Sequence, residues 1–222
     1  MASKARAAFD ENAADVERLL ALHQEKGGSA KGRRFGLEVL NKSAIVLLTS
    51  FWEAYCEDIA AEALDHVVTH APSADKLPTE LRKIVAKELK ADVHDLAVWS
   101  IAGDGWRTVL KSRLAALQAE RNRRLNTPKA AQIDKLFVDA LGISQISSSW
   151  RWARKMNPDR ARTKLDKFVE LRGAIAHRGA AATSVKKAQV TDYFNFLKRL
   201  VAKTGGAVNI HVRAITSKTL WT

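Results

Sequence analysis

The chain has 222 residues, 46% hydrophobic and 27% charged, the composition of a globular protein large enough for one buried core. It has no run of 18 apolar residues, no secretory signal and only one cysteine, so we expect a single cytoplasmic domain, residues 1–222, without membrane span or disulfide. The net charge is +13, and the positive excess lies in residues 67–222, which contain 29 Lys and Arg against 13 Asp and Glu. Residues 1–66 contain 8 Lys and Arg against 11 Asp and Glu. The basic surface that we expect from this excess either attracts nucleic acid or only aids solubility.

The N-terminal part of the chain predicts two helices. Residues 8–25 are amphipathic, with apolar positions spaced three and four apart, and the glycine-rich residues 27–32 end this pattern. A longer helix follows over residues 35–70. Apolar residues surround much of its circumference, so we expect it to be the central helix of the fold.

The middle of the chain continues in helical period. A helix is predicted to begin at Thr79, with its hydroxyl as cap, and two more are predicted over residues 104–125 and 129–141. Residues 92–103 contain several apolar side chains without a clear period. They fit either a short helix or a packed loop.

The C-terminal part predicts an irregular connection over residues 144–157, and then a helix that Asn157 and Pro158 start and that ends at His177. The last helical region spans residues 184–203, and Gly205-Gly206 is expected to interrupt it. Residues 208–215 are β-branched enough to form either a helix or a strand. The chain is therefore predicted to be an all-α helical bundle.

Arg172 and His177 are the best candidates for chemistry. Gly179 is a predicted C-cap, which would place His177 in the last helical turn. A histidine that exchanges protons beside a permanent cation suits the cleavage of phosphate esters. Five residues of helix separate the side chains by about 140° around the axis, so they meet only if Arg172 wraps round, the helix end distorts or a second copy contributes. Alternatively, Arg172 pairs with Glu170 or Asp166, and His177 only caps the helix.

Further basic residues could bind nucleic acid. The loop around Trp150 and Trp152 alternates aromatic and cationic residues, which suits stacked RNA bases, although both tryptophans could equally be core or dimer anchors. The predicted RNA-binding residues are Arg121, Arg123, Arg124, Arg151, Arg154, Lys155 and Arg178.

Four segments, taken in order, resemble one protein family. The Arg172-Gly-Ala-Ile-Ala-His177 segment matches the Arg-x4-6-His signature of HEPN domains, which are helical modules often found as metal-independent ribonucleases in defence and toxin systems. Over about residues 35–215 the chain resembles the RiboL-PSP-HEPN branch, with residues 1–34 as an N-terminal helix and glycine-rich loop. The other three segments are Ser50-Phe-Trp-Glu-Ala-Tyr55, Leu125-Asn-Thr-Pro128 continuing to Leu141-Gly-Ile143, and the leucine-rich approach to Arg172.

The resemblance implies a bundle with a long central helix and peripheral helices, and a homodimer with its active site at the dimer interface. It further implies cleavage of RNA through the ribose 2′-hydroxyl, with Arg172 and His177 as catalytic residues. Glu53 lies on the central helix, where it either orients these residues or faces solvent. Gly173 departs from the family pattern, because active members usually have asparagine or another polar residue there.

The other motifs do not predict an alternative enzyme. His66 and His70 have the spacing of metal ligands, but they lack the intervening glutamate of a zinc protease and read as helix-end histidines. We therefore expect neither a metal nor a cofactor. The alternative to a ribonuclease is a catalytically silent HEPN module that binds RNA or a protein, and a purely structural helical protein is the third interpretation. A neutralising or regulatory protein partner is a further expectation.

Overall fold

Apolar residues recur every three or four positions along most of the chain, and a computed structural model shows helices where they do. It describes residues 2–27, 36–121, 127–152, 156–178 and 184–221. These ranges contain no strand, which agrees with the all-α prediction. Their elements are α1 (Lys4–Gly27), α2 (Glu38–His70), η1 (Ala74–Lys76), α3 (Thr79–Lys90), η2 (Ala97–Ile101), α4 (Gly105–Arg121), α5 (Ala130–Leu141), η3 (Ile146–Ser149), α6 (Pro158–Arg178) and α7 (Lys187–Thr216).

Helix α2 is the central element, as its apolar circumference predicts. It packs against α1, α4, α5, α6 and α7. Trp52 on this helix is fully buried, and its ring contacts those of Tyr55 and Trp150 at centroid distances of 6.1 and 5.9 Å. Because α2 is covered on several sides, its orientation determines where the shorter helices lie.

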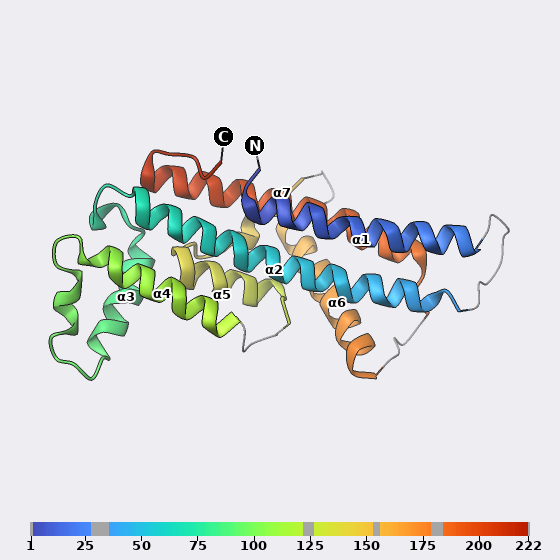
Figure 1. Ribbon diagram of the computed structural model, residues 1–222, viewed down its shortest axis with the longest axis horizontal. Helices are drawn as coiled ribbons and strands as arrows, with labels where there is room; N and C mark the ends of the chain where they lie inside the picture. Colours follow the sequence, from blue (N-terminus) through green and yellow to red (C-terminus); the bar gives the residue numbers. More distant parts are fainter. Residues whose placement is uncertain (1, 28–35, 122–126, 153–155, 179–183, 222) are drawn as a thin grey trace.

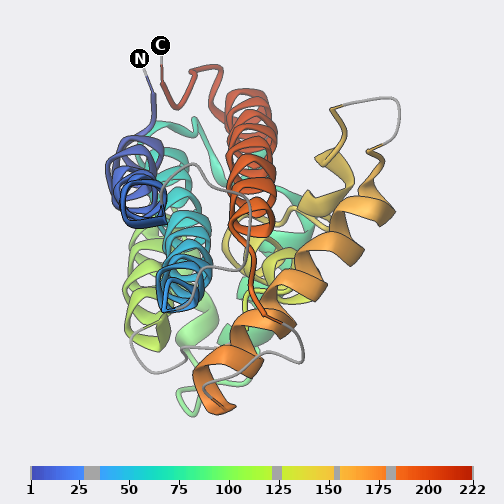
Figure 2. The same cartoon turned by 90° about the vertical axis from the view of Figure 1, so that its right-hand side faces the viewer.

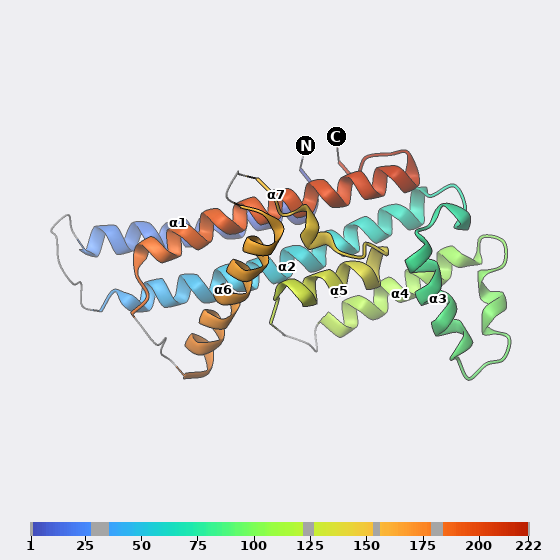
Figure 3. The ribbon, with the colours of Figure 1, turned by 180° about the vertical axis from the view of Figure 1, so that it is seen from behind.

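The helices form a bundle along α2. Helices α1 and α7 run alongside α2, and the two chain ends lie close together (Figure 1). Viewed end-on, α6 crosses the long helices obliquely rather than joining their bundle (Figure 2). Helix α3 and the segment that leads into α4 form the end of the molecule away from α6 (Figure 3). None of the described helices has the length and apolar character that a membrane span requires.

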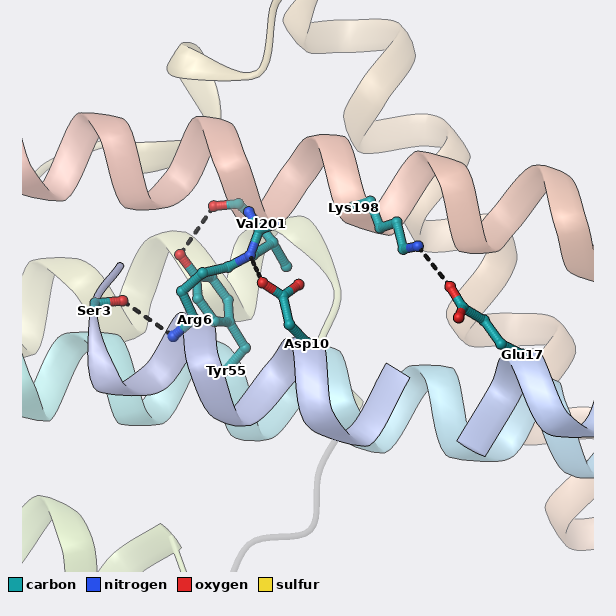
Figure 4. Close-up of polar contacts among 7 residues, drawn as sticks. All are labelled: Ser3, Arg6, Asp10, Glu17, Tyr55, Lys198 and Val201. Atoms are coloured by element: carbon teal, nitrogen blue, oxygen red, sulfur yellow. Dashed lines mark hydrogen bonds and ion pairs between the residues drawn. The ribbon is translucent and has the colours of Figure 1, made fainter. Parts of the chain in front are cut away.

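Polar contacts order the start of α1 and join this helix to α7 (Figure 4). The Ser3 hydroxyl accepts a hydrogen bond from the Arg6 backbone N–H at 3.0 Å and so caps the start of the helix. Arg6 pairs with Asp10 at 2.7 Å, and Glu17 pairs with Lys198 of α7 at 3.0 Å. These ion pairs are exposed, so each contributes orientation more than stability.

Helix α7 continues through Gly205 and Gly206, so the predicted interruption is wrong, and residues 208–215 are helical. The reason lies in α2. The buried Tyr55 hydroxyl donates a hydrogen bond to the Val201 carbonyl at 2.9 Å, as Figure 4 shows. A Cβ at Gly205 would lie only 2.7 Å from this hydroxyl, so the glycine provides room for a contact between helices.

These two glycines offer a matched stability test. We expect Gly206→Ala to raise the free energy of unfolding by about 1 kcal/mol, because a Cβ there meets nothing within 4 Å and alanine favours the helix. Gly205→Ala should instead lower it. The ring of Tyr55 is held by Phe9 and Trp52 and cannot easily retreat. Urea unfolding of both variants measures the difference, and equal effects would contradict the packing role of Gly205.

One smaller expectation needs correction, and one open alternative is decided. Thr79 is the first residue of α3 and not its cap; Pro78 precedes the helix, without a side-chain capping bond. Residues 92–103 contain the short helix η2, the first of the two alternatives, and they are not a packed loop, because Val93 is 91% exposed and Trp99 73%.

Candidate functional site

Helix α6 determines how Arg172 and His177 are displayed. Asn157 caps it, because its side-chain oxygen accepts a hydrogen bond from the Arg160 N–H at 2.9 Å. One face of the helix is buried against the bundle. This burial fixes the rotation of α6 about its own axis and so determines the direction in which each of its side chains points. The buried stripe on this face consists of Ala161, Leu165, Phe168, Val169 and Ile175.

Arg172 lies within this buried stripe. It follows Phe168 by four residues and precedes Ile175 by three, so it occupies the same side of the helix. Its side chain is partly buried, and its buried Nε has no hydrogen-bond partner in the described structure. A buried donor of a permanent cation without an acceptor is costly. Arg172 therefore has hydrogen-bonding capacity that the fold does not use.

The two carboxylates predicted as alternative partners of Arg172 are engaged elsewhere. Asp166 accepts a hydrogen bond from the Ala130 N–H at 2.9 Å and so caps the start of α5. Glu170 pairs with Lys129 at 2.7 Å and raises the pKa of that lysine. The sequence pattern does not predict these contacts with the start of α5. They contradict the simple explanation of Arg172 as one half of a local ion pair.

His177 is exposed in the last turn of α6. Five helical residues separate it from Arg172, which corresponds to about 140° of rotation. Arg172 therefore lies on the bundle side, whereas His177 faces solvent. Gly179, the predicted cap, lies outside the described residues.

Gly173 leaves open space beside Arg172. A Cβ built there would meet nothing within 4 Å, so packing does not require glycine at this position. Glycine inside a helix costs about 1 kcal/mol relative to alanine. The Cβ of another residue would therefore fit here without a clash.

Glu53 is partly buried on α2, which contacts α6. The adjacent Trp52 indole donates a hydrogen bond to the Pro128 carbonyl at 3.4 Å. Residues 128–130 thus contact Trp52 of α2 and the Asp166 and Glu170 carboxylates of α6. Burial raises the pKa of the Cys56 thiol, and the nearby charges of Glu57 and Glu53 raise it further. Glu53 is therefore located on the helix that supports the motif helix, and its role stays a prediction.

The structure describes few of the predicted RNA-binding side chains. Arg151 is exposed. Trp150, by contrast, belongs to the core: it is fully buried, and its indole N–H donates to the Thr204 hydroxyl at 2.9 Å. Trp152 packs against Phe196 at 5.8 Å between ring centroids. The side chains outside the described part are Arg121, Arg123, Arg124, Arg154, Lys155 and Arg178.

His66 and His70 stack at the C-terminal end of α2, with 4.4 Å between their ring centroids. Burial, followed by the proximity of His70, lowers the pKa of His66. Among the described residues, no three His, Cys, Asp or Glu side chains come together in a way that could hold a metal ion. The pair closes the end of α2, far along the helix from Glu53.

A comparison with known families agrees with this arrangement. A family model described as RiboL-PSP-HEPN matches residues 10–209, nearly the whole chain. The match begins earlier than the sequence resemblance and includes most of α1. No curated protein and no solved structure gives a significant match. The all-α bundle, its central helix and the extent of the match together lead to one conclusion: the chain belongs to the RiboL-PSP-HEPN family.

Proposed function

We propose that this protein is a metal-independent endoribonuclease that cleaves RNA through the ribose 2′-hydroxyl. The observation that carries the proposal is Arg172, which has a buried Nε without a partner although two carboxylates lie nearby in the sequence. A guanidinium with a buried donor that the fold leaves unsatisfied is suited to a ligand that brings oxygen acceptors. RNA phosphate supplies them.

His177 would transfer protons in this reaction. It would act either as the general base that removes the proton from the 2′-hydroxyl or as the general acid that protonates the leaving 5′-oxygen, a role worth about 10²–10⁴ in rate. Arg172 would bind the scissile phosphate and stabilise the charge that develops on it. The products are a 2′,3′-cyclic phosphate and a 5′-hydroxyl, so DNA should not be cut.

The separation of the two side chains favours a site made by two copies. Arg172 and His177 start about 140° apart on one helix, so one protomer does not readily direct both at the same phosphate. In a homodimer with facing α6 helices, each copy could supply the group that the other lacks. Glu53, on the helix that contacts α6, would then orient Arg172 or His177 from behind.

The charge distribution supports RNA as the substrate. The excess of Lys and Arg over residues 67–222 attracts a polyanion and speeds encounter with it. Exposed Arg151 would hold RNA phosphates, together with the predicted basic residues outside the described part. The biological setting we propose is cytoplasmic defence or a toxin system, with a protein partner that neutralises or regulates the enzyme.

The direct test uses labelled RNA and DNA pools with chelator present. We expect the protein to cut RNA in EDTA and to leave DNA intact. Cleavage that is lost in EDTA and restored by magnesium would exclude the proposed mechanism. RNA binding without cleavage would instead favour the silent module, and neither binding nor cleavage would favour a purely structural protein.

Gly173 is the specific reason to retain the silent module as a second candidate. If glycine has only weakened a working site, Gly173→Asn should increase cleavage, because the new Cβ meets open space and the side-chain amide restores a polar group beside Arg172. It should also stabilise α6 slightly. The test compares the cleavage of RNA by three proteins, namely the wild type, Gly173→Asn and Gly173→Asn/His177→Ala. A folded dimer that is inactive in all three forms would replace the nuclease proposal with the binding one.

A further inference from the structure

The segment between α3 and α4 exposes an unusual amount of apolar surface. Among the described residues, eight large hydrophobic side chains are exposed, and five of them fall within residues 93–101. Leu96 and Trp99 are each 73% exposed. Single exposed apolar residues are ordinary, but a contiguous group on a soluble protein marks a surface that binds something. We name residues 91–105 the apolar loop.

The apolar loop is held in one shape. Successive turns close through backbone hydrogen bonds of 2.8–3.0 Å, including Trp99 N–H to the Leu96 carbonyl and Ala102 N–H to the Trp99 carbonyl. A Cβ at Gly105 would lie 2.1 Å from the Ser100 carbonyl oxygen, so the turn can close only on glycine. Arg107 then ties the start of α4 to α2 by donating to the Ala71 carbonyl at 2.8 Å. The apolar side chains are therefore presented on a fixed framework.

The charge of the apolar loop restricts what can bind it. Residues 91–105 contain three aspartates, namely Asp92, Asp95 and Asp104, and no lysine or arginine, in a chain of net charge +13. RNA phosphates and anionic lipid headgroups are repelled by such a segment. A protein surface that combines an apolar recess with basic side chains is complementary to it.

The chain itself carries such a recess. On the outer side of α3, Lys83, Lys87 and Lys90 line a shallow, open recess of about 450 Å³ together with Ala86 and with Ala91, the first residue after the helix. Its lining therefore combines two small apolar side chains with three lysines. The apolar loop packs next to α3 in the same chain, yet Trp99 remains 73% exposed, so a protomer does not fill its own recess.

We propose that the apolar loop binds the α3 recess of a second copy of this chain. The loop and recess are adjacent, so a two-fold axis between them would make the contact twice, with each copy giving its loop and receiving its partner's. Trp99 would enter the recess, and Asp92 and Asp95 would face its lysines. This contact lies at the end of the molecule away from α6 (Figure 3), so it is separate from the proposed catalytic dimer.

Cysteine crosslinking between two differently tagged copies tests this contact. One copy carries Ala86→Cys in the recess, and the other carries Leu96→Cys in the apolar loop. The native Cys56 is fully buried and does not compete. We expect a disulfide-linked heterodimer to form on mild oxidation. The matched control pairs Ala86→Cys with Leu22→Cys, an exposed position on the half of α1 that lies at the opposite end of the molecule (Figure 1).

Charge reversal then tests the complementarity. Adding Lys87→Glu/Lys90→Glu to the recess copy should reduce crosslinking at least about tenfold, because like charges across an interface cost several kcal/mol. Adding Asp92→Lys/Asp95→Lys to the loop copy should restore it. Crosslinking no greater than in the Leu22 control, or a reduction that the second reversal does not restore, overturns the proposal. Since no step measures RNA cleavage, the contact and the nuclease proposal can fail independently.

Discussion

Replacing His177 by alanine is expected to abolish RNA cleavage, with a rate loss of at least about 10²–10⁴. The side chain is exposed in the last turn of α6, so its removal opens no cavity in the core. The thermal midpoint and the affinity for RNA should therefore stay close to those of the wild type. Single-turnover cleavage and RNA binding, measured on the same preparations, separate proton transfer from substrate binding.

The control for this experiment is the exposed histidine His94, in the segment between α3 and α4. His94→Ala removes the same chemical group from the end of the molecule away from α6. It should cleave RNA like the wild type. A folded His177→Ala protein that retains wild-type cleavage would remove His177 from the mechanism.

Replacing Arg172 by methionine should separate catalysis from stability. Methionine keeps an unbranched apolar stem but removes a buried donor that has no partner. Its loss should leave the free energy of unfolding unchanged or higher. Cleavage should fall by about 10²–10³, the typical cost of removing one group that stabilises charge in a transition state. Urea unfolding and single-turnover kinetics measure the two effects.

Arg172→Lys is the companion variant. Lysine retains the charge but not the planar fork that binds two phosphate oxygens, so it should recover only part of the activity. The Arg172→Met variant should also bind RNA with a salt dependence that is weaker by about 0.7 on a log–log plot, which corresponds to one lost phosphate contact. A strongly destabilised Arg172→Met protein with normal kinetics would assign Arg172 a structural role.

The long central helix and the motif helix could be predicted from local patterns. Apolar residues all around α2 indicated its central position, and Asn157 indicated the start of α6. The continuity of α7 could not be predicted in this way, because the contact that explains Gly205 comes from Tyr55, which is remote in the sequence. Glycine pairs within a helical pattern indicate an interruption unless such a tertiary contact is known.

The sequence proposes the residues of the candidate site, but it does not predict their surroundings. Spacing alone left Arg172 free to pair with Glu170 or Asp166, since all three lie on one helix. Only the structure shows that both carboxylates contact α5 at Lys129 and Ala130. For the apolar loop, the hydrophobic composition indicated either a short helix or a loop packed against the core. Composition cannot distinguish an apolar residue in the core from one that is displayed to solvent.

Product chemistry tests the central claim most directly. RNA of defined sequence is incubated with the protein in EDTA, and the new ends are identified by mass spectrometry. The same oligonucleotide with a single 2′-deoxy residue at the cleavage position is the matched substrate. We expect 2′,3′-cyclic phosphate and 5′-hydroxyl ends from the RNA and no cut at the deoxy position. Cleavage at the deoxy position, or 5′-phosphate ends, would contradict a mechanism in which His177 acts on the 2′-hydroxyl.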